Sequence, residues 1–176
     1  TTVTAGARAT YAAADANEVR DPVTNTQTEL EDDWTALTGS LRFETRVVES
    51  EAGTVALFGG ISQGFRAPNL SDLTRFDSAR SNEFEVPSPG LEPERFISYE
   101  LGLKHATERL SLQLAAFLTD GDDIIQRFPT GNVNGSGEIE ITKANVGESR
   151  IGGVELGAAF RMTDDWTAFG NIAWLD

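Results

Sequence analysis

Cysteine is absent from this chain of 176 residues, and histidine and methionine each occur once. Without cysteine the chain can form no disulfide and no thiolate metal site, and His105 alone cannot form a histidine cluster. The sequence also offers no nucleophile paired with a base, because a single histidine and no cysteine leave few options. We therefore expect a protein that is not an enzyme and that holds no cofactor.

Basic residues are scarce as well, with 14 Lys and Arg against 28 Asp and Glu and a formal net charge of −14. A nucleic-acid partner would require a basic stripe, so we expect none. Long apolar runs are also missing. The longest, Val55–Ile61, includes two glycines and is far shorter than the roughly 20 residues of a membrane helix. Strands that cross a membrane alternate and give only a weak signal of this kind, so they are not excluded.

Alternation with a period of two dominates the sequence. Between Arg109 and Leu118, apolar residues fill every even position, while Arg109, Ser111 and Gln113 stand between them. This pattern is typical of strands with two different faces. It predicts seven strands, at about 1–14, 34–49, 54–66, 95–105, 109–127, 139–162 and 166–176. Most are at least as long as the roughly 9–11 residues with which a tilted strand crosses a bilayer.

The connections between these strands alternate in length. Those at 15–33, 67–94 and 128–138 are long and polar, and those at 50–53, 106–108 and 163–165 are short. Outer-membrane barrels have this asymmetry, whereas a β-sandwich has no reason to sort its loops by length. We therefore predict an all-β, antiparallel, up-and-down segment of a transmembrane β-barrel. All its pairs should be antiparallel and between nearest neighbours, with no helix longer than a turn or two outside 67–94.

The two faces of the strands should meet different surroundings. The predicted lipid-facing residues are Leu41, Leu57, Leu101, Leu112 and Leu156. The predicted lumen-facing residues are Arg42, Glu44, Arg66, Glu100, Lys104, Gln113 and Glu155, because an unpaired charge against lipid would be costly. Aromatic residues near the strand ends would form the interfacial girdles of a barrel; these are Tyr11, Trp34, Phe65, Phe128 and Trp166.

Four short segments follow one another in a specific order. They are Gly64–Leu70 (GFRAPNL), Pro89–Glu94 (PGLEPE), Tyr99–Lys104 (YELGLK) and Arg150–Glu155 (RIGGVE). Each alone is a weak signal. Their order and spacing resemble the β-barrel domain of TonB-dependent outer-membrane receptors, over about 36–176. One small departure is Ser88, which stands where the family usually has asparagine.

The resemblance implies a plugged barrel of about 22 strands in the outer membrane of a Gram-negative-type bacterium. Such a receptor imports a scarce ligand with energy from an inner-membrane TonB-type complex. Residues 1–176 would then be a partial barrel domain of about seven strands. We expect no plug domain, TonB box or signal peptide within them. The implied partners are outer-membrane lipid, the plug domain, against which the lumen-facing residues would lie, the TonB-type complex and a small ligand.

The interval Asn69–Ser88 bears on the ligand. It contains no His, Cys, Met or Tyr and so offers no usual axial ligand for haem iron. It does offer Arg75, Phe76, Arg80 and Phe84, which can hold a ligand by hydrogen bonds and aromatic contact. An iron–siderophore complex, whose metal is already ligated, is the expected ligand, with cobalamin and small glycans left open.

Two further interpretations concern acidity. The chain could instead be a soluble or surface-exposed acidic binding module of the adhesin type, built as a β-sandwich. The acidic residues of the long connections would most simply form a solvated surface, although they could also attract cations; these residues are Glu29, Glu31, Asp32, Asp33, Glu83, Glu85, Glu92 and Glu94.

Overall fold

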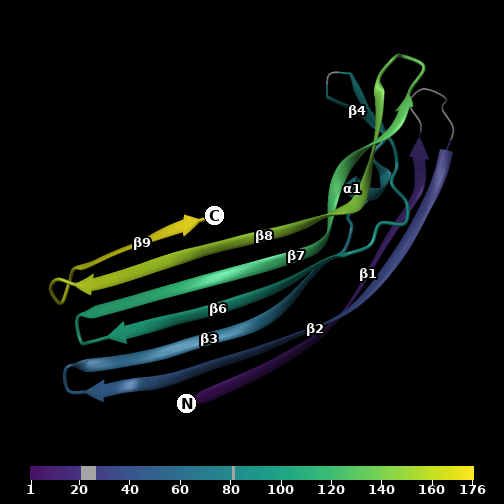
Figure 1. The fold of residues 1–176 in the computed structure, drawn as a ribbon. Helices are drawn as coiled ribbons and strands as arrows, with labels where there is room; N and C mark the ends of the chain where they lie inside the picture. The colour runs from purple at the N-terminus through teal and green to yellow at the C-terminus, as the bar shows by residue number, and fades with distance from the viewer. Residues whose placement is uncertain (21–26, 81) are drawn as a thin grey trace.

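The computed structural model describes residues 1–20, 27–80 and 82–176, and its strands form one curved, mostly antiparallel sheet (Figure 1). The strands that build the wall are β1 (Thr2–Arg20), β2 (Gln27–Ser50), β3 (Gly53–Arg66), β6 (Glu94–Ala106), β7 (Leu110–Val133), β8 (Ile139–Arg161) and β9 (Thr167–Leu175). Each pairs with the next in the chain. All nine strands of the described residues belong to this one sheet, so the two-sheet sandwich is wrong.

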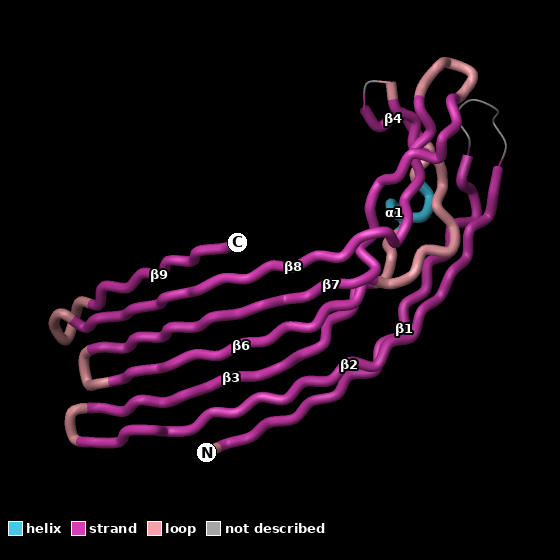
Figure 2. The backbone as a smooth tube through the Cα atoms, in the orientation of Figure 1, coloured by secondary structure: helices cyan, strands magenta, loops and turns pink. Residues whose placement is uncertain are grey.

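Short turns join the strands at one end, and the remaining elements lie at the other (Figure 2). There the connection between β3 and β6 holds α1 (Leu70–Thr74), β4 (Asp77–Arg80) and β5 (Glu83–Glu85). No helix among the described residues is long and apolar enough to cross a membrane. The predicted arrangement of seven antiparallel strands with long and short connections at opposite ends is confirmed.

One part of the predicted topology is wrong. β5 pairs with β8 in parallel, with Glu83 opposite Ile139 and Glu85 opposite Ile141, so the sheet is not entirely antiparallel. This pairing arises because the connection between β3 and β6 leaves the wall and returns beside β8. Strands of three and four residues carry too few residues for an alternation to be recognised, and β4 and β5 were missed for that reason.

Two of the predicted loops are largely strand. β1 and β2 stay paired up to Arg20 and Gln27, and β7 and β8 up to Val133 and Ile139. Residues 21–26 of the predicted 15–33 connection lie outside the described residues. Beyond the apolar wall both faces of a hairpin meet polar surroundings, so the alternation is lost while the backbone still needs its hydrogen bonds. The ladder therefore continues without a sequence signal, interrupted by bulges.

The strand register gathers side chains of one kind on each face. Leu57, Leu103, Leu114, Leu156 and Ile172 form one row across five strands. All five predicted lipid-facing leucines share the face of this row, called here the outer face. On β7 this apolar face extends from Leu110 to Leu118, close to the roughly 9–11 residues that cross a bilayer. Many of its large side chains are exposed, including Leu101 at 56 %.

The opposite face carries the polar side chains and is called the inner face. Arg42, Gly60 and Glu100 stand in one row, and Glu44, Phe58, Gly102 and Glu155 belong to the next. All seven side chains predicted to face the lumen lie on this face. They are Arg42, Glu44, Arg66, Glu100, Lys104, Gln113 and Glu155. Because partners in a ladder share a face, this grouping follows from the register alone.

Two of the five predicted girdle aromatics have another role. Trp34 belongs to the inner face by its register with Ala12 and is buried with 8 % exposure. Phe65 packs against the same apolar cluster as Trp34. Both lie beyond the level at which β2 and β3 stay paired, so their rings fill space between separated strands instead of facing lipid. Tyr11, Phe128 and Trp166 are exposed.

We expect arginine to be tolerated very differently at two adjacent positions in the middle of the apolar stretch of β7, Leu110–Leu118. Leu114→Arg in the full-length protein places a charge in the outer apolar row and should cost about 2–4 kcal/mol of folding free energy in lipid vesicles. Gln113→Arg places it on the inner face and should change that free energy by less than about 0.5 kcal/mol. Denaturant titration of folding into vesicles measures both. Equal costs at the two positions would contradict the assignment of the faces.

Candidate functional site

Residues 67–80 and 82–93, called here the cap, fold back over the inner face of the sheet. Leu73 of α1 and Leu91 pack with Trp34 and Ala14 in a buried apolar cluster. The indole Nε1 of Trp34 donates a hydrogen bond to the carbonyl oxygen of Leu91, at 3.0 Å. The cap is thus anchored on β1 and β2, although it leaves the wall at β3 and rejoins it at β6.

The first motif of the sequence, GFRAPNL, begins the cap. Asn69 is the N-cap of α1: its side-chain oxygen accepts from the backbone N–H of Asp72 at 3.0 Å, and the Asp72 carboxylate accepts from the N–H of Asn69 at 3.1 Å. This capping box starts the helix directly after β3 ends. It directs Leu73 into the apolar cluster, so the motif has a structural role in turning the chain inward.

Ser88, at the position where the resemblance leads one to expect asparagine, docks the cap on β8. Its hydroxyl accepts from the backbone N–H of Lys143 at 2.7 Å and lies 2.9 Å from the hydroxyl of Thr142. Its own N–H donates to the carbonyl of Leu73 at 2.9 Å. Serine therefore joins the second motif to both α1 and β8. It makes these hydrogen bonds although it replaces the asparagine usual in the family.

Arg66 and Glu94 close the base of the cap. The guanidinium donates to both carboxylate oxygens of Glu94, with Nη2 at 2.7 Å from Oε1, and also to Asp72 at 3.0 Å. Glu94 accepts a further bond from the N–H of Ile125 at 3.0 Å. The bonds from Arg66 hold the pKa of Glu94 below its usual range. Burial raises the pKa of Asp72, but the bonds from Asn69, Arg66 and Lys143 outweigh it and lower that pKa as well.

A second ionic cluster centres on Glu85, which is only 2 % exposed. Its carboxylate lies 3.3 Å from Lys143 Nζ, 3.4 Å from Arg127 Nε and 3.6 Å from Arg75 Nε. Arg127 also donates to Glu83 at 2.8 Å, and Lys143 donates to the carbonyl of Ser71 at 2.8 Å. The cluster connects β5 of the cap to β7 and β8 of the wall. The interpretation of the acidic connections as a solvated surface is therefore wrong for Glu85 and Glu94, both buried.

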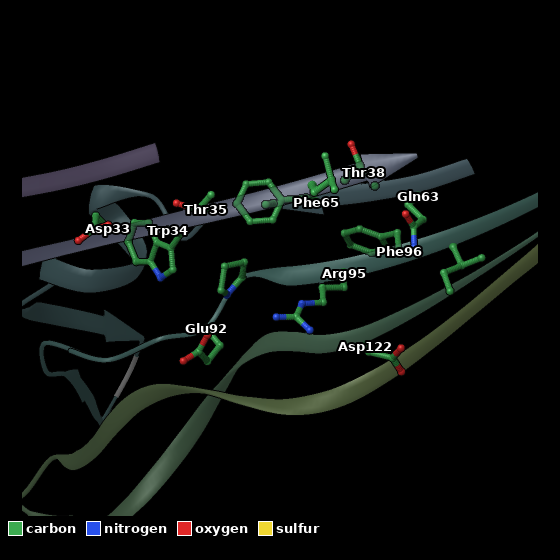
Figure 3. A pocket seen from close by; sticks show the side chains of 15 residues that line it. Asp33, Trp34, Thr35, Thr38, Gln63, Phe65, Glu92, Arg95, Phe96 and Asp122 are labelled. Carbon is green, nitrogen blue, oxygen red and sulfur yellow. The ribbon is translucent and has the colours of Figure 1, made fainter. Parts of the chain in front are cut away.

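A hollow of about 510 Å³ opens where β2 and β3 separate (Figure 3). Their pairing ends at Ser40 and Ser62, and beyond it the side chain of Gln63 accepts from the backbone N–H of Gly39 at 3.0 Å. Trp34 and Phe65 line the hollow together with the cap residue Glu92. Figure 3 shows the guanidinium of Arg95 directed toward its middle. By register Phe65 and Arg95 belong to the outer face and Trp34 to the inner face, so the hollow lies at the gap between the separated strands. It offers aromatic surface, a guanidinium and carboxylates.

The inner face below the cap has a charged lining. Hollows of about 440 and 290 Å³ lie on it, and Arg42 and Glu100 line both. Lys104 donates to Glu44 at 2.7 Å and lies 4.8 Å from the centre of the Phe58 ring. The register places Gly102 beside Phe58, and a side chain there would collide with that ring. Within residues 1–20, 27–80 and 82–176, no ion pair involves Arg42, Glu100 or Glu155.

The four predicted ligand-loop residues are in different situations. Phe84 is buried at 6 % exposure and packs against Phe76, with ring centres 5.7 Å apart. Arg75 lies beside Glu85, and Arg80 is exposed on β4. Sequence reasoning missed Arg127 and Lys143, which anchor the cap. They could have been recognised in the sequence, because they are the only cationic residues between 110 and 149.

Comparisons with known proteins agree with this architecture. The family model described as TonB dependent receptor-like, beta-barrel, matches residues 1–176. An iron-regulated outer membrane virulence protein of Vibrio cholerae serotype O1 is 32 % identical over 114 residues, which are 60 % of this chain and 18 % of that protein. This chain thus spans about a fifth of the length of that relative.

Two solved structures share the fold. One is a double mutant of the Serratia marcescens hemophore receptor HasR in complex with its hemophore HasA and heme. Its TM-score is 0.71 at 18 % identity, covering 99 % of this chain and 30 % of that one. The other is the siderophore receptor PirA from Pseudomonas aeruginosa. Its TM-score is 0.69 at 18 % identity, covering 97 % and 34 %. At these identities the two structures show the fold and not the ligand.

Neutralising Glu94 should loosen the base of the cap. Glu94→Gln in the full-length protein leaves Arg66 without its main partner and should lower the local stability of residues 67–93 by about 1–3 kcal/mol, a range that allows for the partial exposure of Arg66. Hydrogen exchange of the cap amides measures the change. Unaltered protection of the cap in this variant would contradict the role given to the pair.

The same pair gives a pH dependence with a definite sign. The folded-state pKa of Glu94 is lowered, so its contribution is complete above the ordinary glutamate value of about 4.3 and is lost as the pH falls through the lowered value. Protection of the cap should therefore decrease on acidification in the native protein. The decrease should be smaller in the Glu94→Gln variant, which has no such group to protonate.

Proposed function

We propose, from the premise that this chain belongs to the TonB-dependent receptor family and forms part of its β-barrel, that the whole protein imports an iron–siderophore complex. The chain lies in the outer membrane of a Gram-negative bacterium, as predicted. The iron-regulated relative in Vibrio cholerae supports a role in iron supply. Because the chain spans 18 % of that relative, the activity is proposed for the full-length receptor.

The inward-folded cap is the observation that carries this proposal. It covers the inner face at the end of the strands opposite the short turns, where ligand entering from outside would arrive. It presents Arg75 and Arg80, and beside it the hollow lined by Trp34, Phe65 and Arg95 is large enough for part of a small chelate. A metal that arrives fully chelated needs only such hydrogen-bonding and aromatic contacts.

The inner face suits the remaining parts of such a receptor. Arg42, Glu100 and Glu155 carry charges toward the hollows of this face and form no ion pair among the described residues. We assign their partners to the plug domain and the lumen water. Contact with the TonB-type complex is assigned to the receptor's N-terminal region. In this proposal the protein moves its ligand without chemical change, so the chain supplies binding surfaces and no catalytic group.

Uptake of labelled iron tests the proposal. Cells that depend on the full-length receptor should accumulate radioactive iron supplied as hydroxamate or catecholate chelates under iron limitation. The accumulation should stop when an uncoupler dissipates the proton gradient, because transport in this family is energised from the inner membrane. Cobalamin supplied to the same cells is the matched control. Uptake of cobalamin without uptake of any iron chelate would contradict the assigned ligand class.

Haem should not be bound through the cap. The interval Asn69–Ser88 lacks His, Cys, Met and Tyr, so no usual axial ligand reaches a haem iron from it. In a spectral titration of the full-length receptor with haemin, we expect no axial-ligand band that depends on residues 69–88. A tight complex with such a band, abolished when these residues are replaced by a Gly/Ser linker, would overturn this prediction.

A further inference from the structure

Two cations stand directly opposite each other in the ladder of β7 and β8. Arg127 is the register partner of Lys143, and both side chains reach the same buried carboxylate of Glu85. Like charges on opposite residues of a strand pair destabilise it, so this position of the wall requires an anion between them. In the described structure that anion comes from the cap, and Arg75 adds a third positive charge at 3.6 Å.

Glu85 occupies this position loosely. Its contacts of 3.3–3.6 Å are longer than the roughly 2.7–2.9 Å of a strong charge-assisted hydrogen bond. Its Oε1 atom and the Nε of Arg127 are buried without a hydrogen-bond partner among the described residues. The pair formed by Arg66 and Glu94 in the same cap is much tighter, with 2.7 Å between Nη2 and Oε1. A buried polar atom left without a bond costs about 1–3 kcal/mol, so an anion with better geometry would be favoured here.

The attachment of Glu85 is also short, whereas the cations are fixed. β5 has three residues, Glu83–Glu85, which pair in parallel with β8, and backbone hydrogen bonds of Asn82 and Val86 with Ile139 and Ile141 flank this short pairing. Arg127 and Lys143 belong to long strands of the wall, and Lys143 is held in addition by Ser71 and Asp72. Release of β5 would therefore remove Glu83 and Glu85 from two cations that stay in place. Arg75 is 44 % exposed and gives access from solvent.

We propose that Arg75, Arg127 and Lys143 form a binding site for an anionic, carboxylate-bearing iron chelate, and that Glu85 is an internal competitor which the ligand displaces. This inference rests on the proposed function and specifies the charge of its ligand. Displacement withdraws the carboxylates of Glu83 and Glu85, and the carboxylates of the chelate replace them, while Lys143 keeps its contact with Asp72. The exchange detaches β5 from β8, which couples arrival of the ligand to movement of the cap.

The direction in which one substitution changes ligand affinity distinguishes this proposal from a purely structural role of the cluster. In the full-length receptor, Glu85→Gln removes the competitor and should tighten binding of the iron(III)–citrate complex at least about fivefold, because a larger fraction of the sites is vacant. Arg127→Gln and Lys143→Gln should weaken the same binding about tenfold. Calorimetric titration measures these affinities. The cationic iron(III)–desferrioxamine B complex is the charge control, and its affinity should not rise in Glu85→Gln.

Glu31→Gln is the matched variant, since it removes one negative charge from an exposed position of β2, outside this cluster and outside the hollow lined by Trp34 and Phe65. It should change citrate-complex affinity by less than about twofold. If Glu31→Gln tightens binding as much as Glu85→Gln, the effect is a general one of charge and the proposal fails. It also fails if folded Glu85→Gln binds the citrate complex no better than the native receptor, or if neither binds it.

Glu85→Asp keeps the experiment decisive if the glutamine variant does not fold. Aspartate retains the charge but withdraws it by one methylene, so the affinity for the citrate complex should rise by less than in Glu85→Gln. Unchanged affinity overturns the proposal. The inference and the proposed function fail separately. If cells take up iron chelates but the Glu85 variants bind the citrate complex no more tightly than the native receptor, only the proposed anion site is disproved. If Glu85→Gln binds the citrate complex more tightly but cells take up no iron, the proposed function is disproved and the anion site is supported.

Discussion

Pairing of backbone N–H and C=O groups across neighbouring strands is the constraint on which the rest of this structure depends. Lipid offers no hydrogen bonds, so a strand that crosses it must satisfy its backbone through its neighbours. The ladder that results fixes which residues stand side by side. Leu114 is thereby placed in a row of leucines and Gln113 in a row with Lys104 and Ala56. A shift of one residue would exchange the two faces, so the register and the chemistry of the faces are a single property.

The cap exists where this ladder divides. Above Ser40 and Ser62, β2 continues with β1 while β3 continues with β6, and the sheet separates into two parts. Side chains take over the bonding there: Gln63 reaches across to Gly39, and Trp34 bonds the cap at Leu91. The motif residues serve the same purpose. They turn the chain inward and tie it to both parts of the divided sheet, which places a hollow at the division.

Ion pairs in the cap differ in what they contribute. Arg66 and Glu94 make two short, parallel bonds at the base, and the buried carboxylate has a third donor in Ile125. Such geometry repays the desolvation of both charges. Glu85 has three cations around it but none at short range, which leaves buried atoms without hydrogen bonds. The cap is therefore held at its base by short charge-assisted bonds, whereas the carboxylate of Glu85 in β5 is held by charge alone, beside the backbone pairing of β5 with β8.

The sequence by itself determined the seven long strands, the two faces of the wall and the end at which its long connections gather. It could do so because a period of two is a local property, visible in residues such as Leu112 and Gln113 without knowledge of any partner. Only the tertiary structure decided that Trp34 is buried, that β5 runs parallel to β8 and that Glu85 meets Arg127 and Lys143. Those contacts join residues more than 40 positions apart. They depend on where the chain returns after leaving the wall, and no local pattern of residues encodes that path.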